Sequence, residues 1–127
     1  MADTYPPTPT NASGLSLQEL IEGLHLNLVT EPREFERMIP GPVYASDLLS
    51  CVMTGAKQNG LWLTLQAHSN IVAAAALLDL CAVIITEDAA PEPETIEKAN
   101  QQGVTLLLTR QPTYHLAGKL WEMGFRE

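Results

Sequence analysis

The chain has 127 residues and a formal net charge of −8, with only 7 Lys and Arg residues, and its length is typical of one compact domain. Binding to nucleic acid or to an anionic membrane surface needs clustered basic side chains, so this composition argues against both. No apolar stretch approaches the length of a membrane span.

The start of the chain differs in composition from the rest. Residues 1–14 are rich in Pro, Thr, Ser and Asn, which predicts a flexible tail, with an ordered arm on a partner subunit as the alternative. Residues 15–127 then form a single domain. The first residues lack the basic and apolar regions of a secretory signal, so we expect a cytoplasmic protein. Cys51 and Cys81 lie in apolar surroundings without CxxC spacing, which favours buried, reduced thiols over a disulfide.

The first predicted elements are a short helix and a strand. Ser16 and Glu19 have the spacing of a capping box, which predicts a helix that runs to about Leu24. Apolar and polar residues then alternate over residues 24–29, a pattern typical of a half-buried strand. The charged stretch that follows ends at Pro40-Gly41-Pro42, which indicates a turn or loop.

A second strand and helix follow this turn. Val43–Ala45 predicts a short strand, and Ser46 or Asp47 can cap a helix over residues 48–57. The side chains expected on the inner face of this helix are Leu48, Leu49, Val52 and Met53.

Three apolar runs then alternate with helical segments, as in the strands of a parallel sheet that is buried on both faces. The runs are residues 61–65, 82–85 and 104–108. The residues expected to begin or end the intervening helices are Asn70, Pro93, Gly103, Thr113 and Gly124. This order predicts an α/β domain with a mainly parallel central sheet covered by helices on both faces.

The predicted binding edge lies where the parallel strands end and the next helices begin, because ligands of open parallel sheets bind there. Four such junctions follow the predicted strands, and we expect their polar side chains to converge along one edge. The candidate ligand-binding residues are Ser46, Asp47, Gln66, His68, Ser69, Asn70, Thr86, Glu87, Thr109 and Arg110.

These candidates also have ordinary structural explanations. Ser46, Asp47 and Asn70 are favoured N-cap residues, and capping alone would account for them. His68 is the strongest candidate because it lies in a loop beside helix-end amides, although a lone loop histidine is more often structural. Arg110 can hold an anion or form a surface salt bridge.

Catalytic motifs do not occur in this sequence. It has no P-loop, no G-x-S-x-G elbow, no G-x-G-x-x-G after a strand and no H-E-x-x-H. The three histidines lack metal-ligand spacing with the cysteines. We therefore expect no catalytic residue, no metal site and no cofactor. The alternative is a small metabolic enzyme that uses His68 and Asp47 as acid and base.

The helix predicted after Asn70 is apolar on all sides. Residues 73–76 are four consecutive alanines, which let other helices approach closely. Such a helix is either central in the domain or in contact with a second subunit. We expect a homodimer with an isologous contact.

Several segments together resemble the DRTGG domain family, which is related to the N-terminal domain of HPr kinase/phosphorylase. The segments are VYASDLLS at residues 43–50, LTLQAHSNIVA at residues 63–73 and IITED at residues 84–88, with Pro91 and Gly103-Val104. The resemblance extends over residues 15–125. It implies a three-layer α/β/α fold like the N-terminal domains of certain Mur ligases, and a regulatory or oligomerising role. Kinase activity is not implied, because in HPr kinase it belongs to a separate P-loop domain.

The chain departs from the motif that gives this family its name. His68-Ser69 replaces an Asp-Arg pair, and Glu87-Asp88 follows Thr86 where the family has two glycines. Losing the glycines prevents the closest backbone approach to a ligand and adds negative charge, which disfavours a nucleotide or phosphate. The helix end at Asn70 can still accept an anion.

These observations favour a non-catalytic regulatory or scaffolding domain that dimerises and binds a small metabolite along the junction edge. The alternatives are the enzyme described above and a pure protein-interaction subunit that has no pocket. A partner enzyme is a further candidate for what the domain binds.

Overall fold

A computed structural model describes residues 14–126 of the chain. The tail predicted over residues 1–14 lies, apart from Gly14, outside the described residues. In the described part of the chain, no helix has both the length and the apolar character needed to span a bilayer.

One five-stranded sheet forms the centre of the molecule, with strand order β1-β5-β4-β3-β2. The four strands from β2 to β5 are parallel to their neighbours, whereas β1 pairs antiparallel with β5 at the edge. The predicted mainly parallel α/β sheet is therefore confirmed. The strands are β1 (Asn27–Leu28), β2 (Val43–Ala45), β3 (Leu61–Thr64), β4 (Ala82–Ile85) and β5 (Leu106–Leu108).

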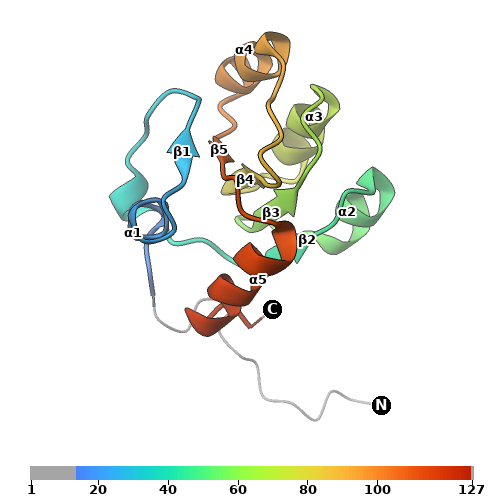
Figure 1. Cartoon of the computed structure of the whole chain (residues 1–127). Helices are drawn as coiled ribbons and strands as arrows, with labels where there is room; N and C mark the ends of the chain where they lie inside the picture. Colours follow the sequence, from blue (N-terminus) through green and yellow to red (C-terminus); the bar gives the residue numbers. More distant parts are fainter. Residues whose placement is uncertain (1–13, 127) are drawn as a thin grey trace.

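Helices cover both faces of this sheet, as predicted (Figure 1). Because β2 to β5 are neighbours in chain order, their crossover helices α2, α3 and α4 lie side by side on one face. Helices α1 and α5 cover the other face. The helices are α1 (Leu17–Gly23), the 3-10 helix η1 (Phe35–Arg37), α2 (Leu49–Gly55), α3 (Asn70–Leu77), α4 (Pro93–Gln102) and α5 (Thr113–Glu122).

Two apolar cores separate these three layers. Successive strand side chains point to opposite faces, so Leu63 and Ile84 pack towards α1 and α5. Trp62, Val83 and Ile85 pack towards the other three helices. All five side chains are fully buried, which explains why the strands are apolar at consecutive positions.

The predicted ends of α1 and α4 are confirmed. In the α1 capping box, the Glu19 N–H donates to Ser16 Oγ and the Ser16 N–H donates to Glu19 Oε1, both at 3.1 Å. Pro93 is the first residue of α4, and Gly103 follows its end with φ of 70°. Each of these signals acts through neighbouring backbone atoms, so local sequence is sufficient to specify it.

The strand predicted over residues 24–29 is much shorter than expected. The first part of that stretch closes α1, because the Leu24 N–H donates to Leu20 O and the Leu26 N–H donates to Ile21 O. His25 lies between them with φ of 55°. Both leucines are buried, so the alternation comes from a helix-terminating turn rather than from a strand.

The inner face predicted for the second helix is only partly correct. Val52 is fully buried and Leu49 is partly buried, but Leu48 and Met53 are 60% and 37% exposed. The helix starts at Leu49, later than the start predicted with Ser46 or Asp47 as its cap. Leu48 therefore lies outside the helix and its side chain faces solvent.

Both cysteines are free thiols, as predicted, but their burial differs. Cys81 is buried in the core on the α1 and α5 side, whereas Cys51 is only partly buried. Burial raises the pKa of the Cys81 thiol from 9.0 to about 11, because the thiolate would lose its solvation there.

Candidate functional site

The four strand–helix junctions lie along the same edge of the sheet, because β2 to β5 run parallel. Their polar side chains do not form one cluster. The first two junctions bond to each other, and so do the last two. Within the second junction, the part of the loop that contains Ala67 and His68 faces helix α4.

At the first two junctions, Asp47 fastens β2 to β3. Its Oδ1 accepts hydrogen bonds from Thr64 Oγ1 and from the Leu65 N–H, both at 2.8 Å. Gln66 Nε2 donates to the Asp47 carbonyl at 3.1 Å, and Ser46 Oγ accepts from the Leu48 N–H at 3.1 Å. The expectation that Ser46 or Asp47 is the N-cap of α2 is therefore wrong, because Asp47 bonds across to the neighbouring strand and Leu48 holds the cap position.

The third and fourth junctions are joined through Glu87 and Thr113. Glu87 Oε2 accepts from the Thr113 N–H at 2.7 Å, and the hydroxyls of Thr86 and Thr113 are 2.5 Å apart. Thr113 was expected to cap α5, but it is the first residue of the helix and Glu87 caps it from another loop. Backbone bonds from Glu87 and Asp88 to Gln111 O and Thr109 O fix the two loops together.

His68 acts as a cap for α3. Its Nδ1 accepts a hydrogen bond from the Asn70 N–H at 3.2 Å, and Ser69 holds the N-cap position without a side-chain bond. Asn70, expected to be the cap, is instead the first residue of the helix. Thr95 Oγ1 donates to the Ala67 carbonyl at 3.0 Å, which attaches this loop to the start of α4.

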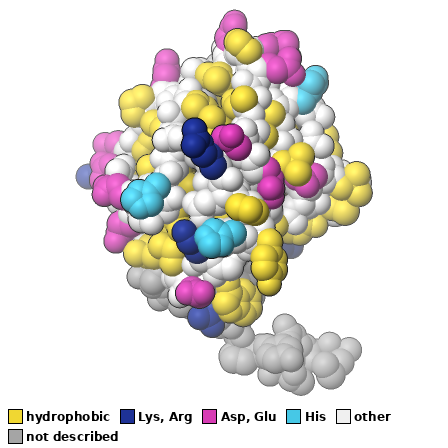
Figure 2. All heavy atoms as spheres, viewed as in Figure 1, with side chains coloured by type: hydrophobic (Ala, Val, Ile, Leu, Met, Phe, Trp, Pro, Cys, Tyr) yellow, Lys and Arg dark blue, Asp and Glu magenta, His cyan; other side chains and the backbone are white. Residues whose placement is uncertain are grey.

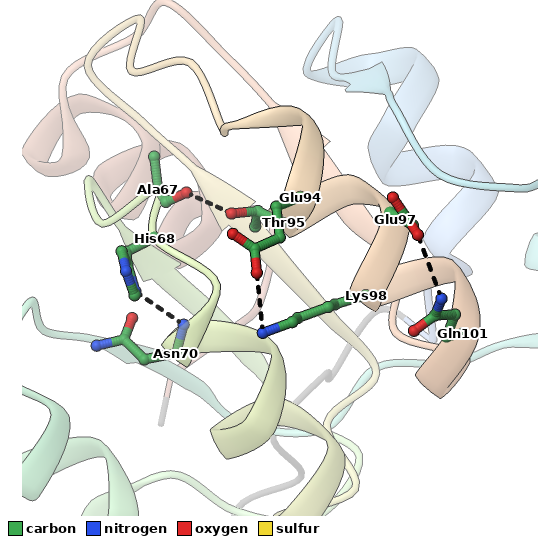
Figure 3. Close-up of polar contacts among 8 residues, drawn as sticks. All are labelled: Ala67, His68, Asn70, Glu94, Thr95, Glu97, Lys98 and Gln101. Carbon is green, nitrogen blue, oxygen red and sulfur yellow. Dashed lines mark hydrogen bonds and ion pairs between the residues drawn. The ribbon is translucent and has the colours of Figure 1, made fainter.

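A groove of about 690 Å³ begins at this loop and runs between α3 and α4 (Figure 3). His68, Ser69 and Asn70 form its polar end, so the structure brings three of the predicted site residues together here. Ala73 and Leu77 of α3 supply an apolar wall.

The opposite wall of the groove comes from α4 and was missed by sequence reasoning. Lys98 extends from α4 towards Asn70, and its Nζ lies 3.3 Å from Glu94 Oε1 (Figure 3). Gln101 and Gln102 continue this wall. These residues lie in the middle and last turns of a helix, away from the strand–helix junctions where the sequence predicts binding residues. The sequence signal for these residues is a polar helical segment that follows an apolar one, and the structure packs the two helices side by side.

Thr109 and Arg110 border a second, smaller hollow on the α1 and α5 side of the sheet. It has a volume of about 370 Å³ and is also lined by His25 and Lys119, which sequence reasoning did not single out. Arg110 Nε lies 3.6 Å from Asp88 Oδ1, and both side chains are exposed.

The acid–base pair of the enzyme alternative is not assembled. Asp47 bonds to Thr64 and Leu65 at the end of the neighbouring strand, and His68 bonds to Asn70 in its own loop. Among residues 14–126, no three His, Cys, Asp or Glu side chains group in a way that would hold a metal ion. The polar groups at the junctions therefore serve mainly to fix the loops, and the groove and the hollow are two open sites that border them.

The fold and these junctions define a three-layer α/β domain with loops fixed along the carboxyl edge of its sheet. The model of the DRTGG domain family matches residues 43–123, and the chain belongs to that family. The match begins at β2, so α1, β1 and His25 lie outside it. The resemblance inferred from the sequence is thereby confirmed.

The fold is similar to that of a solved regulatory region. The neighbour is the crystal structure of the CBS and DRTGG domains of the regulatory region of Clostridium perfringens pyrophosphatase, complexed with the activator diadenosine tetraphosphate. The similarity has a TM-score of 0.74 at 18% sequence identity and covers 96% of this chain. This chain spans about half of the neighbour, 53% of its length. No curated protein sequence matches the chain.

Proposed function

We propose that this chain is a non-catalytic regulatory domain of the cytoplasm that binds a small metabolite in the groove between α3 and α4. The groove carries this proposal, because its volume of about 690 Å³ falls within the range of small-molecule sites, roughly 300–1,000 Å³. Membership of the DRTGG family supports a regulatory role. The Clostridium perfringens structure supports it further, since that regulatory region was crystallised with an activator.

The groove suits a ligand that has one polar end and one apolar face. At the polar end, His68 accepts a hydrogen bond at Nδ1, so a neutral imidazole carries its proton at Nε2 and can donate it to a ligand. Lys98 and Gln101 supply further donors from the opposite wall. Ala73 and Leu77 offer apolar surface along α3, and Leu77 is 74% exposed.

Thermal-shift measurements with a panel of metabolites test this proposal. A ligand at 100 times its dissociation constant adds about 2.7 kcal/mol to the free energy of unfolding, so a binder raises the melting temperature. Ala73→Trp fills the groove and should abolish that rise. Ser50→Trp puts the same side chain at an exposed position of α2 and should leave the rise in melting temperature unchanged. A ligand that still stabilises the Ala73→Trp protein binds elsewhere and contradicts the proposal, as does turnover of a panel member that disappears in His68→Ala.

The proposal includes a homodimer formed through α3, which is apolar along its length. Ala73 is exposed and Leu77 is 74% exposed on this helix, so α3 presents apolar surface to solvent that a second copy of the chain would cover. Sedimentation at tens of micromolar, a concentration on the order at which a standard-size interface assembles, should give a dimer. Leu77→Glu should give a folded monomer. Leu65→Glu, at an exposed position just after β3, should remain dimeric. A monomer for the unmodified chain excludes the dimer.

A further inference from the structure

The hollow on the α1 and α5 side gathers three side chains that can carry positive charge. His25 comes from the turn after α1, Arg110 from the loop after β5 and Lys119 from α5. The chain has 7 Lys and Arg residues against 15 Asp and Glu, so this grouping goes against its overall charge. Figure 2 shows Lys, Arg and His side chains on the face where these segments meet. The hollow is therefore a basic site on an acidic protein.

The backbone at His25 gives a second, independent observation. His25 follows the end of α1 with φ of 55°, a left-handed position that glycine usually occupies and that costs other residues conformational energy. Gly103 holds the corresponding position after α4 with φ of 70°. Non-glycine residues in such conformations are concentrated at functional sites. Asn59, Asp79, Glu87 and Asp88 have the same conformation among the described residues, and at His25 the left-handed turn places the imidazole at the edge of the hollow.

The walls of the hollow are fixed relative to each other by Gln111. Its Nε2 donates to the Leu24 carbonyl at the end of α1 and to Thr109 Oγ1, both at 3.1 Å. This side chain ties the loop after β5 to the segment that contains His25. Arg110 and His25 are therefore held on neighbouring, ordered backbone before any ligand arrives, which lowers the entropic cost of binding.

Glu87 and Asp88, which stand where the family has glycines, do not prevent an anion from reaching this hollow. Glu87 is occupied, because its Oε2 accepts the Thr113 N–H at 2.7 Å. Asp88 lies 3.6 Å from Arg110, and the side chains of the pair are 73% and 90% exposed, so the pair contributes little stability. An incoming anion can therefore take the place of the Asp88 carboxylate at Arg110.

We propose that this hollow binds a phosphate group of a small ligand, which Arg110, Lys119 and His25 contact, and that Arg110 exchanges the Asp88 carboxylate for it. The planar guanidinium matches the spacing of two phosphate oxygens, and Lys119 adds a second fixed charge. This site lies on the opposite side of the sheet from the groove between α3 and α4, so it extends the proposed function rather than repeating it. Free inorganic phosphates and phosphate esters share this chemistry.

Isothermal titration calorimetry of the full chain at low salt tests the site with inorganic pyrophosphate and with AMP as probes. Arg110→Gln and Lys119→Gln should each weaken binding about tenfold, as expected for loss of one charge-assisted hydrogen bond. Asp88→Asn should tighten it several-fold. Arg126→Gln removes the same charge from a residue stacked on Trp121, 5.0 Å from its ring centre, and should leave affinity unchanged. If AMP and pyrophosphate both bind, the site accepts esters as well as free phosphates; pyrophosphate alone indicates a free inorganic anion.

His25→Gly separates binding from a merely structural role. Glycine relieves the left-handed backbone, so the melting temperature should stay the same or rise while pyrophosphate affinity falls. The proposal is overturned if neither probe binds, or if Arg126→Gln weakens binding as much as Arg110→Gln does. Ala73→Trp, which fills the groove, should leave pyrophosphate binding intact, so the failure of one site is distinguishable from the failure of the other.

Discussion

At the scale of single residues, the backbone conformations of the carboxyl edge differ from what the side chains alone would indicate. Glu87 and Asp88 have φ of 62° and 59°, so they keep the left-handed backbone that the family's two glycines would adopt most easily. Glu87 uses this conformation to reach the first amide of α5. The loop shape is therefore retained with acidic side chains in place of glycine.

Cys81 gives the residue-scale prediction, which concerns alkaline stability. Burial raises the pKa of this thiol from 9.0 to about 11 in the folded protein, so the folded state holds its proton more tightly than the unfolded state. The stabilisation is complete below pH 9.0 and is lost as pH rises towards 11. A shift of this size corresponds to about 2–3 kcal/mol of unfolding free energy.

Urea unfolding at a series of pH values measures this loss. Tyrosines and lysines also titrate in the alkaline range, so the informative quantity is the difference between variants. Cys81→Ala should flatten the decline above pH 9, although it lowers stability at neutral pH by leaving a small cavity. Cys51→Ala, at the partly buried thiol, should keep the full decline. Equal slopes in the two variants would show that Cys81 does not cause it.

At the scale of helices and strands, the sequence predicted the elements well and their beginnings unevenly. The starts of α1 and α4 are set by Ser16 and Pro93, whose effects are local. The starts of α3 and α5 are instead completed by His68 and Glu87, which lie in preceding loops. Propensity identifies Asn70 and Thr113 as good caps, but it cannot show that another side chain already holds the helix end.

Two glycines supply the element-scale prediction, because an added methyl group would meet opposite surroundings. At Gly118 in α5, a Cβ would have nothing within 4 Å, so Gly118→Ala should stabilise the helix by about 0.5–1 kcal/mol. At Gly60, before β3, a Cβ would lie 2.5 Å from Pro42 O and 2.7 Å from Lys57 O. Both atoms are backbone and cannot turn away, so Gly60→Ala should be destabilising by at least about 1 kcal/mol.

Thermal unfolding of the two alanine variants checks the sign of each change. Gly118→Ala should raise the melting temperature by a few degrees and Gly60→Ala should lower it. A gain in both variants would mean that the backbone around Gly60 relaxes freely, which its buried position and its hydrogen bond to Lys57 O argue against.

At the scale of the whole molecule, the sequence predicts where the sites lie better than which residues make them. Parallel apolar strands place one edge of the sheet correctly, and His68 and Arg110 both border open sites there. Lys98 of α4 and Lys119 of α5 complete those sites from positions within helices rather than from strand–helix junctions. Their contribution depends on how helices pack across the sheet, which neither spacing nor composition specifies.

The net charge of the chain leads to the last prediction, which is that added salt stabilises the fold but weakens anion binding. The formal charge of −8 produces self-repulsion that salt screens, since the Debye length falls from about 30 Å at 0.01 M to about 8 Å at 0.15 M ionic strength. The three ion pairs found among residues 14–126 are all exposed, so screening them costs little. The free energy of unfolding should therefore rise with NaCl over this range, while pyrophosphate affinity should fall. The double variant Glu36→Gln/Glu122→Gln removes two negative charges and should show a smaller rise. A free energy of unfolding that falls with NaCl would mean that specific ion pairs, rather than net repulsion, dominate the electrostatics of this fold.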